Sequence, residues 1–459
     1  MITELSLENF KSWKRIDGMR FAPITGLFGT NSSGKTGILQ LLLLIKQTVE
    51  STDRLQVLDF GNDKSPANLG SFREVVFSHE GPPAKLDWSI RWKLPTSLKI
   101  KNPEDRKTDL FVGDEIGFSV EITENDKKRL GVKEIAYSFA GRDFKMERKP
   151  DDRNTYTLSV SPSDGFSFQR TVGRPKDLPA PVKCYGFPNE VNARYQNASF
   201  LSDLQLEFER LFTGTKYLGP LREYPKRQYA WSGVEPADMG QRGERVVEAI
   251  LAARDRNLQL SRGKGRAKVM ETLEERVAVW LKEFGLIDSF HVEPISKEGG
   301  NIYRVKVRRS PTSPDVLITD VGFGVSQILP AIVLCYYAPK GSIIILEQPE
   351  IHLHPAVQAG LADVFIDAVR TRGIQIIFES HSEHLLKRLQ RRIAEQEITP
   401  ETTALYFCET ENGGSKLTTL DVDLFGNIQN WPKDFFGDQF GEMAAMTKAA
   451  LNRKKAQQG

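Results

Sequence analysis

The chain has 459 residues, of which 39% are hydrophobic and 27% charged, which excludes wholesale disorder, collagen and long coiled-coil rods. Its 63 Lys and Arg nearly balance its 60 Asp and Glu, so a nucleic-acid-binding surface would have to be a local basic patch. The three cysteines, Cys184, Cys335 and Cys408, lie far apart and form no CxxC pair, so they imply neither a disulfide framework nor a cysteine-based zinc site. No signal peptide is recognisable, and no apolar run approaches the ~20 residues of a membrane span, so we expect a cytoplasmic protein without a membrane segment.

Residues 1–195 are expected to join α/β elements to an antiparallel β lobe. Residues 2–7 alternate in polarity and residues 24–28 form a short apolar run, so both segments predict strands. A helix is expected from about residue 34 to residue 48. Several short alternating segments, separated by turns rich in Gly, Asp and Pro, lie between residues 70 and 170, which is typical of an antiparallel β lobe.

Residues 196–290 are expected to form a helical insertion. Three segments in this interval have apolar residues at i, i+3 and i+4, namely Leu201–Phe212, Gln241–Arg254 and Ala267–Phe284. The spacing shows no sustained heptads, so no long coiled coil is expected.

Residues 291–450 return to an α/β pattern, and residues 451–459 form a polar tail that we expect to fray. The expected strands of the α/β part are 342–346, 374–378 and 403–408, and the expected helices are 326–337, 355–371 and 382–396. The fold class is therefore α/β.

The strongest local motif is GxxxxGK[ST], which follows the strand at 24–28 and opens the next helix. Its residues include Gly29, Asn31, Ser32, Ser33, Gly34, Lys35 and Thr36. Glycines let successive backbone N–H groups surround phosphate oxygens, and the helix N-terminus adds its positive end. Lys35 would reach the β- and γ-phosphates, and the Thr36 hydroxyl would ligate Mg²⁺. The motif predicts a P-loop that binds a nucleotide.

Two further strand ends supply polar side chains for such a site. The apolar run 342–346 ends in Glu347, which we expect to hold Mg²⁺ directly or through water. The strand at 374–378 is followed by Glu379, Ser380 and His381, and a histidine in this place could contact a γ-phosphate.

A second anion-binding segment lies upstream of the acidic strand, where the sequence runs from Asp320 through Gly324, Ser326 and Gln327 into an apolar helix. We expect Ser326 to be the N-cap of this helix, and Pro330 to lie close enough to its start to be tolerated. A glycine-rich helix N-terminus is itself an anion site. Two phosphate sites in one chain predict a head-to-tail pair of protomers, each lending this helix to the nucleotide of the other.

The order of these motifs resembles that of ABC-type ATPase heads, and within them the bacterial group related to SMC, RecF and the overcoming-lysogenization-defect (OLD) proteins. The segments that are similar to that group are Ile2–Thr36, Tyr217–Arg222, Glu347–Pro355, Glu379–His384 and Trp431–Phe436. The resemblance implies an ABC-type P-loop ATPase head with an antiparallel β lobe and a helical insertion. Several members of the group are ATPase subunits of anti-phage systems such as Septu and PARIS, each of which works with a separate nuclease or toxin effector.

The resemblance also implies roles for individual residues. It makes ATP and Mg²⁺ the cofactors and a homodimer, or a higher even oligomer, the assembly. The P-loop residues would bind phosphate and Mg²⁺, Ser326 and Gln327 would close the partner's site, and Glu347 would be the acid on the metal side. His381 would be the switch histidine, and His352, Leu353, His354 and Pro355 would occupy the dimer-loop region. The loop that brings a further glutamine to Mg²⁺ has no recognisable position in this sequence.

One position departs from the pattern of the family. Many ABC heads have a glutamate after the metal-side acid that polarises the attacking water, whereas this chain has Gln348. A carboxamide can orient water but is a very poor base, so we expect ATP binding with slow hydrolysis. The alternative is that Glu350 is the base.

Several weaker features have competing interpretations. The basic clusters Arg262–Lys268 and Lys387–Arg392 could contact nucleic acid or form solvated faces. Arg222 could approach the nucleotide or form a structural ion pair. Asp421 and Asp423 resemble the acid pair of a TOPRIM nuclease, but too few residues follow for that domain. The histidines at 352, 354, 381 and 384 fit the motifs better than they fit a metal site.

Two functions remain open from the sequence. The first is a regulatory ATPase that dimerises around ATP and controls a separate effector, a nuclease or toxin, during phage infection. The second is a RecF-like repair clamp that binds DNA directly. The motifs carry the prediction of nucleotide binding, while the defence role depends on resemblance.

Overall fold

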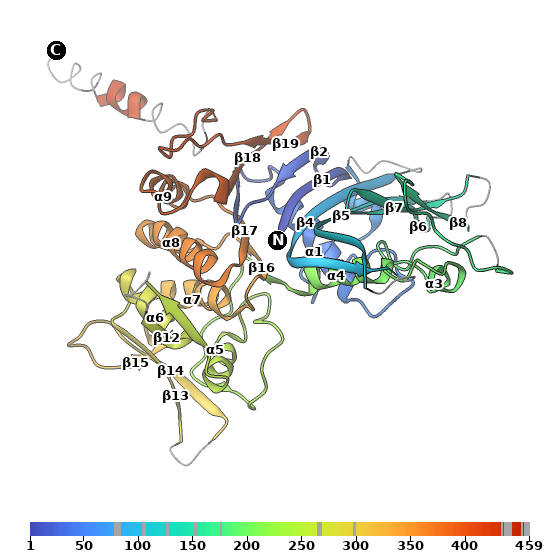
Figure 1. The fold of residues 1–459 in the computed structure, drawn as a ribbon. Coiled ribbons are helices and arrows are strands. Elements are labelled where there is room, and N and C mark those ends of the chain that lie inside the picture. Colours follow the sequence, from blue (N-terminus) through green and yellow to red (C-terminus); the bar gives the residue numbers. More distant parts are fainter. Residues whose placement is uncertain are drawn as a thin grey trace.

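Two β-sheets organise the chain, one antiparallel and one mostly parallel, and they lie side by side in Figure 1. The computed structural model describes residues 1–77, 84–102, 107–124, 128–150, 155–174, 177–263, 269–296, 300–432, 435, 443–450 and 453. Residues 264–268 of the first basic cluster, residues 433, 434 and 436 of the closing segment, and all of the expected tail except residue 453 lie outside this description.

The central sheet has the strand order β19-β18-β3-β17-β16-β9, and only β19 runs antiparallel to its neighbour. Its strands are β3 (Ile24–Gly29), β9 (Thr215–Leu218), β16 (Ile343–Glu347), β17 (Gln375–Glu379), β18 (Thr403–Glu411) and β19 (Gly414–Thr419). Continuous apolar runs form its middle strands because both of their faces are buried. In β16, for example, Ile343 and Ile345 enter one hydrophobic core and Ile344 and Leu346 enter the other.

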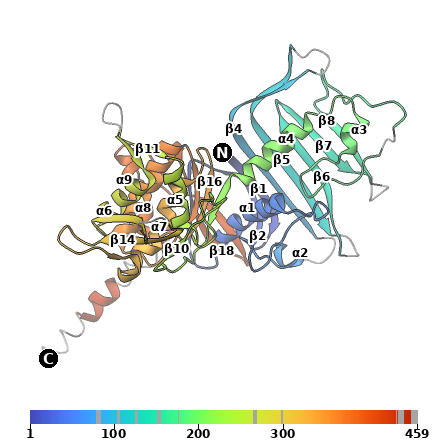
Figure 2. The ribbon, with the colours of Figure 1, turned by 90° about the horizontal axis from the view of Figure 1, so that it is seen from below.

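Helices cover the two faces of this sheet (Figures 1 and 2). On one face lie α1 (Lys35–Glu50) and α4 (Leu201–Thr213), whose buried residues join the core of the β lobe. The helices that contribute to the second core are α5 (Val246–Asp255), α6 (Leu273–Glu283), α7 (Phe323–Tyr337), α8 (Pro355–Arg372) and α9 (Glu383–Ala394). The predicted α/β class is confirmed.

The antiparallel sheet is the predicted β lobe, and it also contains the two N-terminal strands, in the order β2-β1-β4-β5-β6-β7-β8. Its strands are β1 (Ile2–Phe10), β2 (Trp13–Arg20), β4 (Lys85–Lys101), β5 (Asp109–Glu124), β6 (Leu130–Phe139), β7 (Arg142–Arg148) and β8 (Tyr156–Ser161). Phe208 of α4 packs on its inner face against Trp88 and Phe118, with ring centroids 6.2 and 4.7 Å apart. Short helices α2 (Phe72–Val75) and α3 (Glu190–Arg194) flank the lobe.

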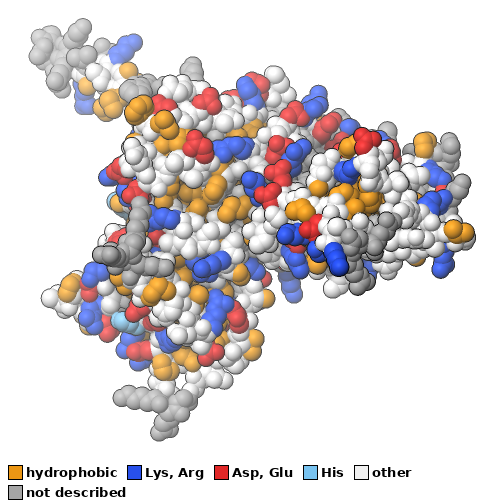
Figure 3. Space-filling model, viewed as in Figure 1, with side chains coloured by type: hydrophobic (Ala, Val, Ile, Leu, Met, Phe, Trp, Pro, Cys, Tyr) orange, Lys and Arg blue, Asp and Glu red, His pale blue; other side chains and the backbone are white. Residues whose placement is uncertain are grey.

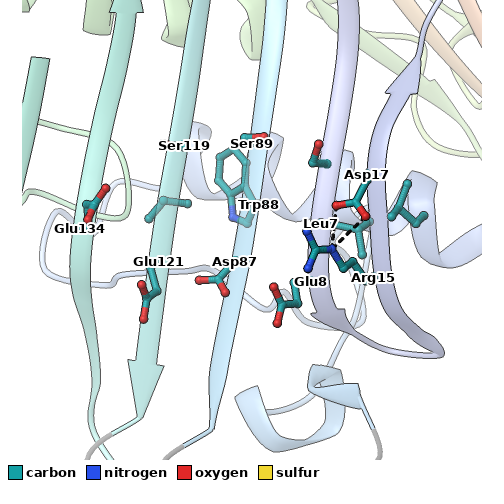
Figure 4. A pocket seen from close by; sticks show the side chains of 13 residues that line it. Leu7, Glu8, Arg15, Asp17, Asp87, Trp88, Ser89, Ser119, Glu121 and Glu134 are labelled. Atoms are coloured by element: carbon teal, nitrogen blue, oxygen red, sulfur yellow. Dashed lines mark hydrogen bonds and ion pairs between the residues drawn. The ribbon is translucent and has the colours of Figure 1, made fainter. Parts of the chain in front are cut away.

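The outer face of the lobe carries a row of acids across four strands. Glu8, Asp87, Glu121 and Glu134 are successive register partners, and they line a hollow of about 300 Å³ (Figure 4). Like charges directly opposite one another destabilise a sheet. Lysines between the strands offset this repulsion, through the pairs Lys85–Glu8, Lys85–Asp87, Lys133–Glu121 and Lys145–Glu134.

The interval 196–290 differs from the expected helical insertion, because it also contains strands and joins the central sheet through β9. The second helix begins at Val246 rather than Gln241. The third begins at Leu273, since the described residues before it pair in a hairpin and Thr272 and Glu275 form a capping box. The elements of the described chain that have not yet been named, within this interval and after it, are β10 (Tyr229–Ala230), β11 (Gln259–Arg262), β12 (Val269–Thr272), β13 (Ser289–Pro294), β14 (Ile302–Arg308), β15 (Val316–Leu317), η3 (Ile318–Asp320) and η4 (Pro400–Thr402).

No helix in the described part of the chain combines the length and the apolar character that crossing a bilayer requires.

Candidate functional site

The loop between β3 and α1 is shaped by two glycines. Gly29 has φ 141° and Gly34 has φ 88°, in the region that disfavours side chains. A Cβ atom on Gly29 would lie 2.0 Å from the carbonyl oxygen of Cys408, and one on Gly34 would lie 2.3 Å from Ser415 Oγ. Trp13 Nε1 also donates a hydrogen bond to the Gly34 carbonyl at 2.9 Å. Neighbouring strands therefore hold the loop in a form that only glycine permits at these two positions.

Lys35 lies inside this loop. Its Nζ donates to the carbonyls of Thr30 (2.7 Å) and Gly29 (3.1 Å), and the residue is 4% exposed. Burial lowers the pKa of Lys35, while the charge of Glu379 opposes that shift. The side chains of Asn31 and Ser32 are exposed, and Ser33 is buried and donates to the Thr30 carbonyl. Lys35 Nζ also contacts Ser33 Oγ at 3.5 Å. A cation held mainly by backbone carbonyls can transfer to phosphate oxygens, with which it would form charge-assisted hydrogen bonds.

The acids next to the loop come from two strands, and β17 lies between β3 and the strand of Glu347. Thr36 Oγ1 donates to Glu379 Oε2 at 2.7 Å, so Glu379, not Glu347, contacts the P-loop threonine. Glu347 is the register partner of Glu379 and accepts from the Tyr217 hydroxyl at 3.0 Å. Burial, followed by the charge of Glu379, raises the pKa of Glu347 to about 7. Burial also raises the pKa of Glu379.

These groups fit a divalent cation. Two desolvated carboxylates that repel each other and one hydroxyl form a set of hard oxygen donors, which is what Mg²⁺ prefers. A bound cation would relieve both the burial cost and the mutual repulsion. Thr36, Glu379 and Glu347 are therefore the residues that would hold Mg²⁺, and the ion would neutralise charge on the phosphates.

The segment after β16 folds back over the end of β17. Gln348 has φ 42°, its N–H donates to the Glu379 carbonyl at 3.1 Å, and its side chain also hydrogen-bonds Glu379. Glu350 is 6% exposed and accepts from the His381 N–H at 2.7 Å through Oε1. Among the described residues no partner is found for its Oε2. Burial raises the pKa of Glu350.

His381 joins the P-loop to this segment. Its side chain hydrogen-bonds the backbone of Gly29, and burial, followed by the charge of Lys35, lowers its pKa. The structure thus brings together most of the sequence-predicted set, namely the P-loop residues with Glu347, Gln348, Glu350 and His381.

The helix that carries the second anion-binding segment begins earlier than expected. The N-cap of α7 is Gly322, and Ser326 Oγ donates back to the Phe323 carbonyl at 2.8 Å, so the prediction that Ser326 is the N-cap was wrong. The chain becomes helical at Phe323, which leaves Pro330 inside the helix. Gln327 is 3% exposed, and its Nε2 has no partner among the described residues.

The start of α7 is surrounded by aromatic rings rather than by the P-loop. The Phe323 ring is 5.6 Å from that of Tyr224 and 5.5 Å from that of His352. Phe323 and Tyr224 are 42% and 68% exposed. In the described structure no hydrogen bond, ion pair or ring contact joins Gly324, Ser326 or Gln327 to the P-loop of the same chain.

Sequence reasoning assigned no site role to Glu379 or Tyr217, and it left Arg222 between a nucleotide contact and a structural ion pair. The signal for Glu379 was available, because it ends a buried strand as Glu347 does. Tyr217 and Arg222 lie in and after β9, a short edge strand whose place in the central sheet the sequence did not reveal.

Local ion pairs and hydrogen bonds account for the basic residues of α9 and for Asp423, which the sequence offered as weaker candidates. All four basic residues of α9 pair with acids: Lys387 with Glu383, Arg391 with Glu395, and both Arg388 and Arg392 with Asp363. Asp423 accepts from N–H groups of its own loop, including that of Asn427. The described residues contain no group of three or more His, Cys, Asp or Glu that could hold a metal ion. On the face shown in Figure 3, Lys and Arg are interspersed with Asp and Glu.

Comparison with known proteins gives two short family matches. Residues 308–387 match the AAA_21 model, an AAA domain whose description names the AbiEii toxin and type IV toxin–antitoxin systems. Residues 398–446 match DUF3696, a family without an assigned function. A search of curated proteins found no match.

Solved structures that are similar to this chain include SMC heads. The SMC head bound to the C-terminal winged-helix domain of ScpA has 13% identity and a TM-score of 0.45, covering 92% of this chain and 98% of that one. The head from Thermotoga maritima has 12% identity, coverages of 92% and 99%, and a TM-score of 0.42. A head derived from Pyrococcus furiosus, bound to the C-terminal domain of ScpA, has 12% identity, coverages of 91% and 96%, and a TM-score of 0.40.

The P-loop, the order of the central strands and the AAA match agree with one another. The chain carries a P-loop ATPase domain.

Proposed function

We propose that the protein binds ATP and Mg²⁺, dimerises head to tail around them, and acts as the sensor subunit of an anti-phage system that controls a separate nuclease or toxin effector. The observation that carries the dimer is the separation of two half-sites. The P-loop and its acids form one group of contacts, while the glycine-rich start of α7 lies among exposed aromatic rings. Among the described residues, no hydrogen bond, ion pair or ring contact joins Gly324, Ser326 or Gln327 to the P-loop. A second copy of the chain would bring the two halves together.

The effector role has different support. The AAA match covers 308–387, which contain α7, the strand of Glu347 and the end of β17, and its description refers to a toxin–antitoxin system. A nucleotide controls such an assembly only if it binds one state more tightly than the other, and a dimer that closes around ATP provides that difference. The effector itself would be a separate polypeptide.

The shared site can be tested with two defective variants. Lys35→Ala removes the phosphate contact of one half-site. Gly324→Glu places a carboxylate where the partner's phosphate would bind, and the fold should tolerate it, since a Cβ atom there meets only Leu286 at 3.8 Å. An acid in the first turn of a helix is also favourable. Ser202→Glu, which adds an acid to the exposed first turn of α4, is the matched control.

Each defective variant should fail to form the ATP-dependent dimer, and Ser202→Glu should form it normally. Mixing the two defective variants should restore about a quarter of the wild-type sites, because half of the random pairs carry one complete site. Recovery of no sites in the mixture would contradict the head-to-tail arrangement.

The effector is tested by purifying the tagged protein from its native cell with ATP and Mg²⁺ and measuring the mass of the complex. A second polypeptide in a fixed ratio is the expected result. A homodimer alone, with ATP turnover that DNA stimulates, would contradict effector control and support the repair-clamp function.

A further inference from the structure

Arg222 is a buried cation whose terminal nitrogens find no hydrogen-bond partner among the described residues. It follows β9 at the edge of the central sheet and is 5% exposed. In the described structure neither of its terminal nitrogens has a hydrogen-bond partner, and it takes part in no ion pair. Burying a charge is costly unless it is paired. A guanidinium kept in this state indicates that its partner is a molecule other than the chain itself.

The loop after β9 places Arg222 at the same edge of the sheet as the candidate metal site. β9 pairs in parallel with β16, and Leu218 is opposite Leu346, so the residues after both strands emerge side by side. Burial lowers the pKa of Arg222 to about 10, and the nearby Tyr217, Glu350 and Glu347 oppose that shift. Arg222 is thus close enough to Glu347 and Glu350 for their charges to affect its pKa, but it forms no hydrogen bond with either of them.

Two chains of contacts connect this position to the P-loop. In one, Tyr217 donates to Glu347, which is the register partner of Glu379, and Glu379 accepts from Thr36. In the other, Glu350 accepts from the His381 N–H, and the His381 side chain bonds the backbone of Gly29. Lys35 and Arg222 therefore lie on opposite sides of one group of acids.

We propose that Arg222 binds the γ-phosphate of the nucleotide held by the P-loop of its own chain. The inference rests on the proposed binding of ATP and Mg²⁺, and it adds a cation from the same subunit that distinguishes a triphosphate from a diphosphate. A guanidinium suits this place because it stays charged when buried and offers paired N–H donors to a phosphate. An arginine whose role was to neutralise Glu347 or Glu350 would contact one of them.

Arg222 thereby makes triphosphate recognition a property of the single subunit. The P-loop would bind the phosphates that ATP and ADP share, and through Lys35 it would also reach the γ-phosphate, whereas Arg222 would contact only the γ-phosphate. The monomer should already prefer ATP before a second subunit adds its glycine-rich helix.

The experiment measures the affinity of fluorescent ADP and of a fluorescent, non-hydrolysable ATP analogue, with Mg²⁺, at a protein concentration at which the wild type is monomeric. In Arg222→Met we expect the affinity for the triphosphate to fall by about 10- to 100-fold, the loss of one or two charged hydrogen bonds, and the affinity for ADP to stay within about 2-fold. Arg222→Lys, which keeps the charge but not the paired donors, should lie between. Arg210→Met, which changes an exposed arginine on α4, should bind both nucleotides as the wild type does.

Three outcomes separate this inference from the function on which it rests. A wild type that binds neither nucleotide would refute the proposed function itself. A wild type that binds both equally, or a loss in Arg222→Met that is the same for ADP and the triphosphate, would refute the role of Arg222 alone.

The thermal midpoint of nucleotide-free Arg222→Met should not fall below that of the wild type, because the substitution removes an unpaired buried charge. A lower midpoint would show a structural role, and Arg222→Lys would then carry the affinity comparison.

Discussion

The base that activates water can be identified with Glu350→Gln. The two carboxylate oxygens of Glu350 have different surroundings. Oε1 accepts a hydrogen bond from the His381 N–H, whereas Oε2 has no hydrogen-bond partner among the described residues. Gln348, at the position where many ABC heads have their base, instead hydrogen-bonds Glu379 through its side chain. A buried carboxylate with a free oxygen can take a proton from water, while a carboxamide cannot. We therefore expect Glu350 to be the base.

The size of the effect follows from this arrangement. General-base catalysis contributes about 10²- to 10⁴-fold, so kcat should fall by about that factor in Glu350→Gln. Nucleotide affinity should change by less than about 3-fold, because a carboxamide oxygen can still accept from His381. Burial raises the pKa of Glu350, so wild-type turnover should decline as the pH falls through that raised value. The variant should lose the part of this acidic limb that Glu350 contributes, while the raised pKa values of Glu347 and Glu379 would still act on Mg²⁺ binding.

The assay is phosphate release at saturating ATP and Mg²⁺ between pH 5.5 and 9, with nucleotide binding measured in parallel. Gln348→Glu is the matched control, and it should not accelerate turnover, because it replaces a donor to Glu379 with a third carboxylate. The reasoning would be refuted if Gln348→Glu raised kcat 10-fold or more, or if Glu350→Gln left kcat and its pH profile unchanged.

Three further predictions concern stability. The pKa of Glu347 is about 7 in the folded chain, against 4.5 as the ordinary value, so folding takes up a proton between these pH values. The free energy of unfolding therefore falls as pH rises through this window, by on the order of 3 kcal/mol. In urea titrations in EDTA, Glu347→Gln should be more stable than the wild type at pH 8 and equal to it at pH 4, and an equal difference at both pH values would contradict the shift. Gly29→Ala should destabilise the fold by more than about 2 kcal/mol and abolish ATP binding, because its Cβ atom would collide with a backbone oxygen 2.0 Å away. In the control Gly141→Ala the new Cβ atom meets nothing within 4 Å, so the free energy of unfolding should fall by only about 1 kcal/mol, for the positive φ alone. Arg276→Met should cost about 3 to 5 kcal/mol in the same titrations, since it removes the buried guanidinium that pairs with both Asp367 and Glu271 and leaves these acids, among the described residues, only the more exposed Arg370 and Arg262 as ion-pair partners. A loss below about 1 kcal/mol would show that those two arginines and water compensate for it.

The sequence predicted the α/β class and the β lobe because both have strong local patterns. A buried parallel strand such as Ile343–Glu347 is a continuous apolar run, and the lobe strands alternate at period two. Helix starts were less predictable. The start of α6 depends on a hairpin between two short strands, and the start of α7 precedes Ser326, the residue with the better capping propensity, by three positions.

The candidate site was predictable only where its residues belong to one continuous motif. The P-loop is contiguous, and its required glycines follow from local backbone geometry. The acid that contacts Thr36 could not be chosen in this way, because Glu347 and Glu379 both end buried strands, and the choice between them depends on which strand is next to β3. The sheet places β17 there, so Glu379 reaches the threonine and Glu347 lies one strand further away.

The same strand order explains why a cation that follows β9 can reach the candidate site. Each strand between β3 and β9 ends in an acid, so two carboxyl groups lie next to each other at this edge of the sheet. Burial raises the pKa of both, and Lys35 lowers the pKa of Glu379 from the P-loop side. Arg222 supplies positive charge from the opposite side without bonding to either acid. A phosphate bound between the two cations would satisfy the arginine, while Mg²⁺ would satisfy the carboxylates. We therefore expect the two cations and the two carboxylates to bind a nucleotide together with its metal ion more tightly than either of them alone.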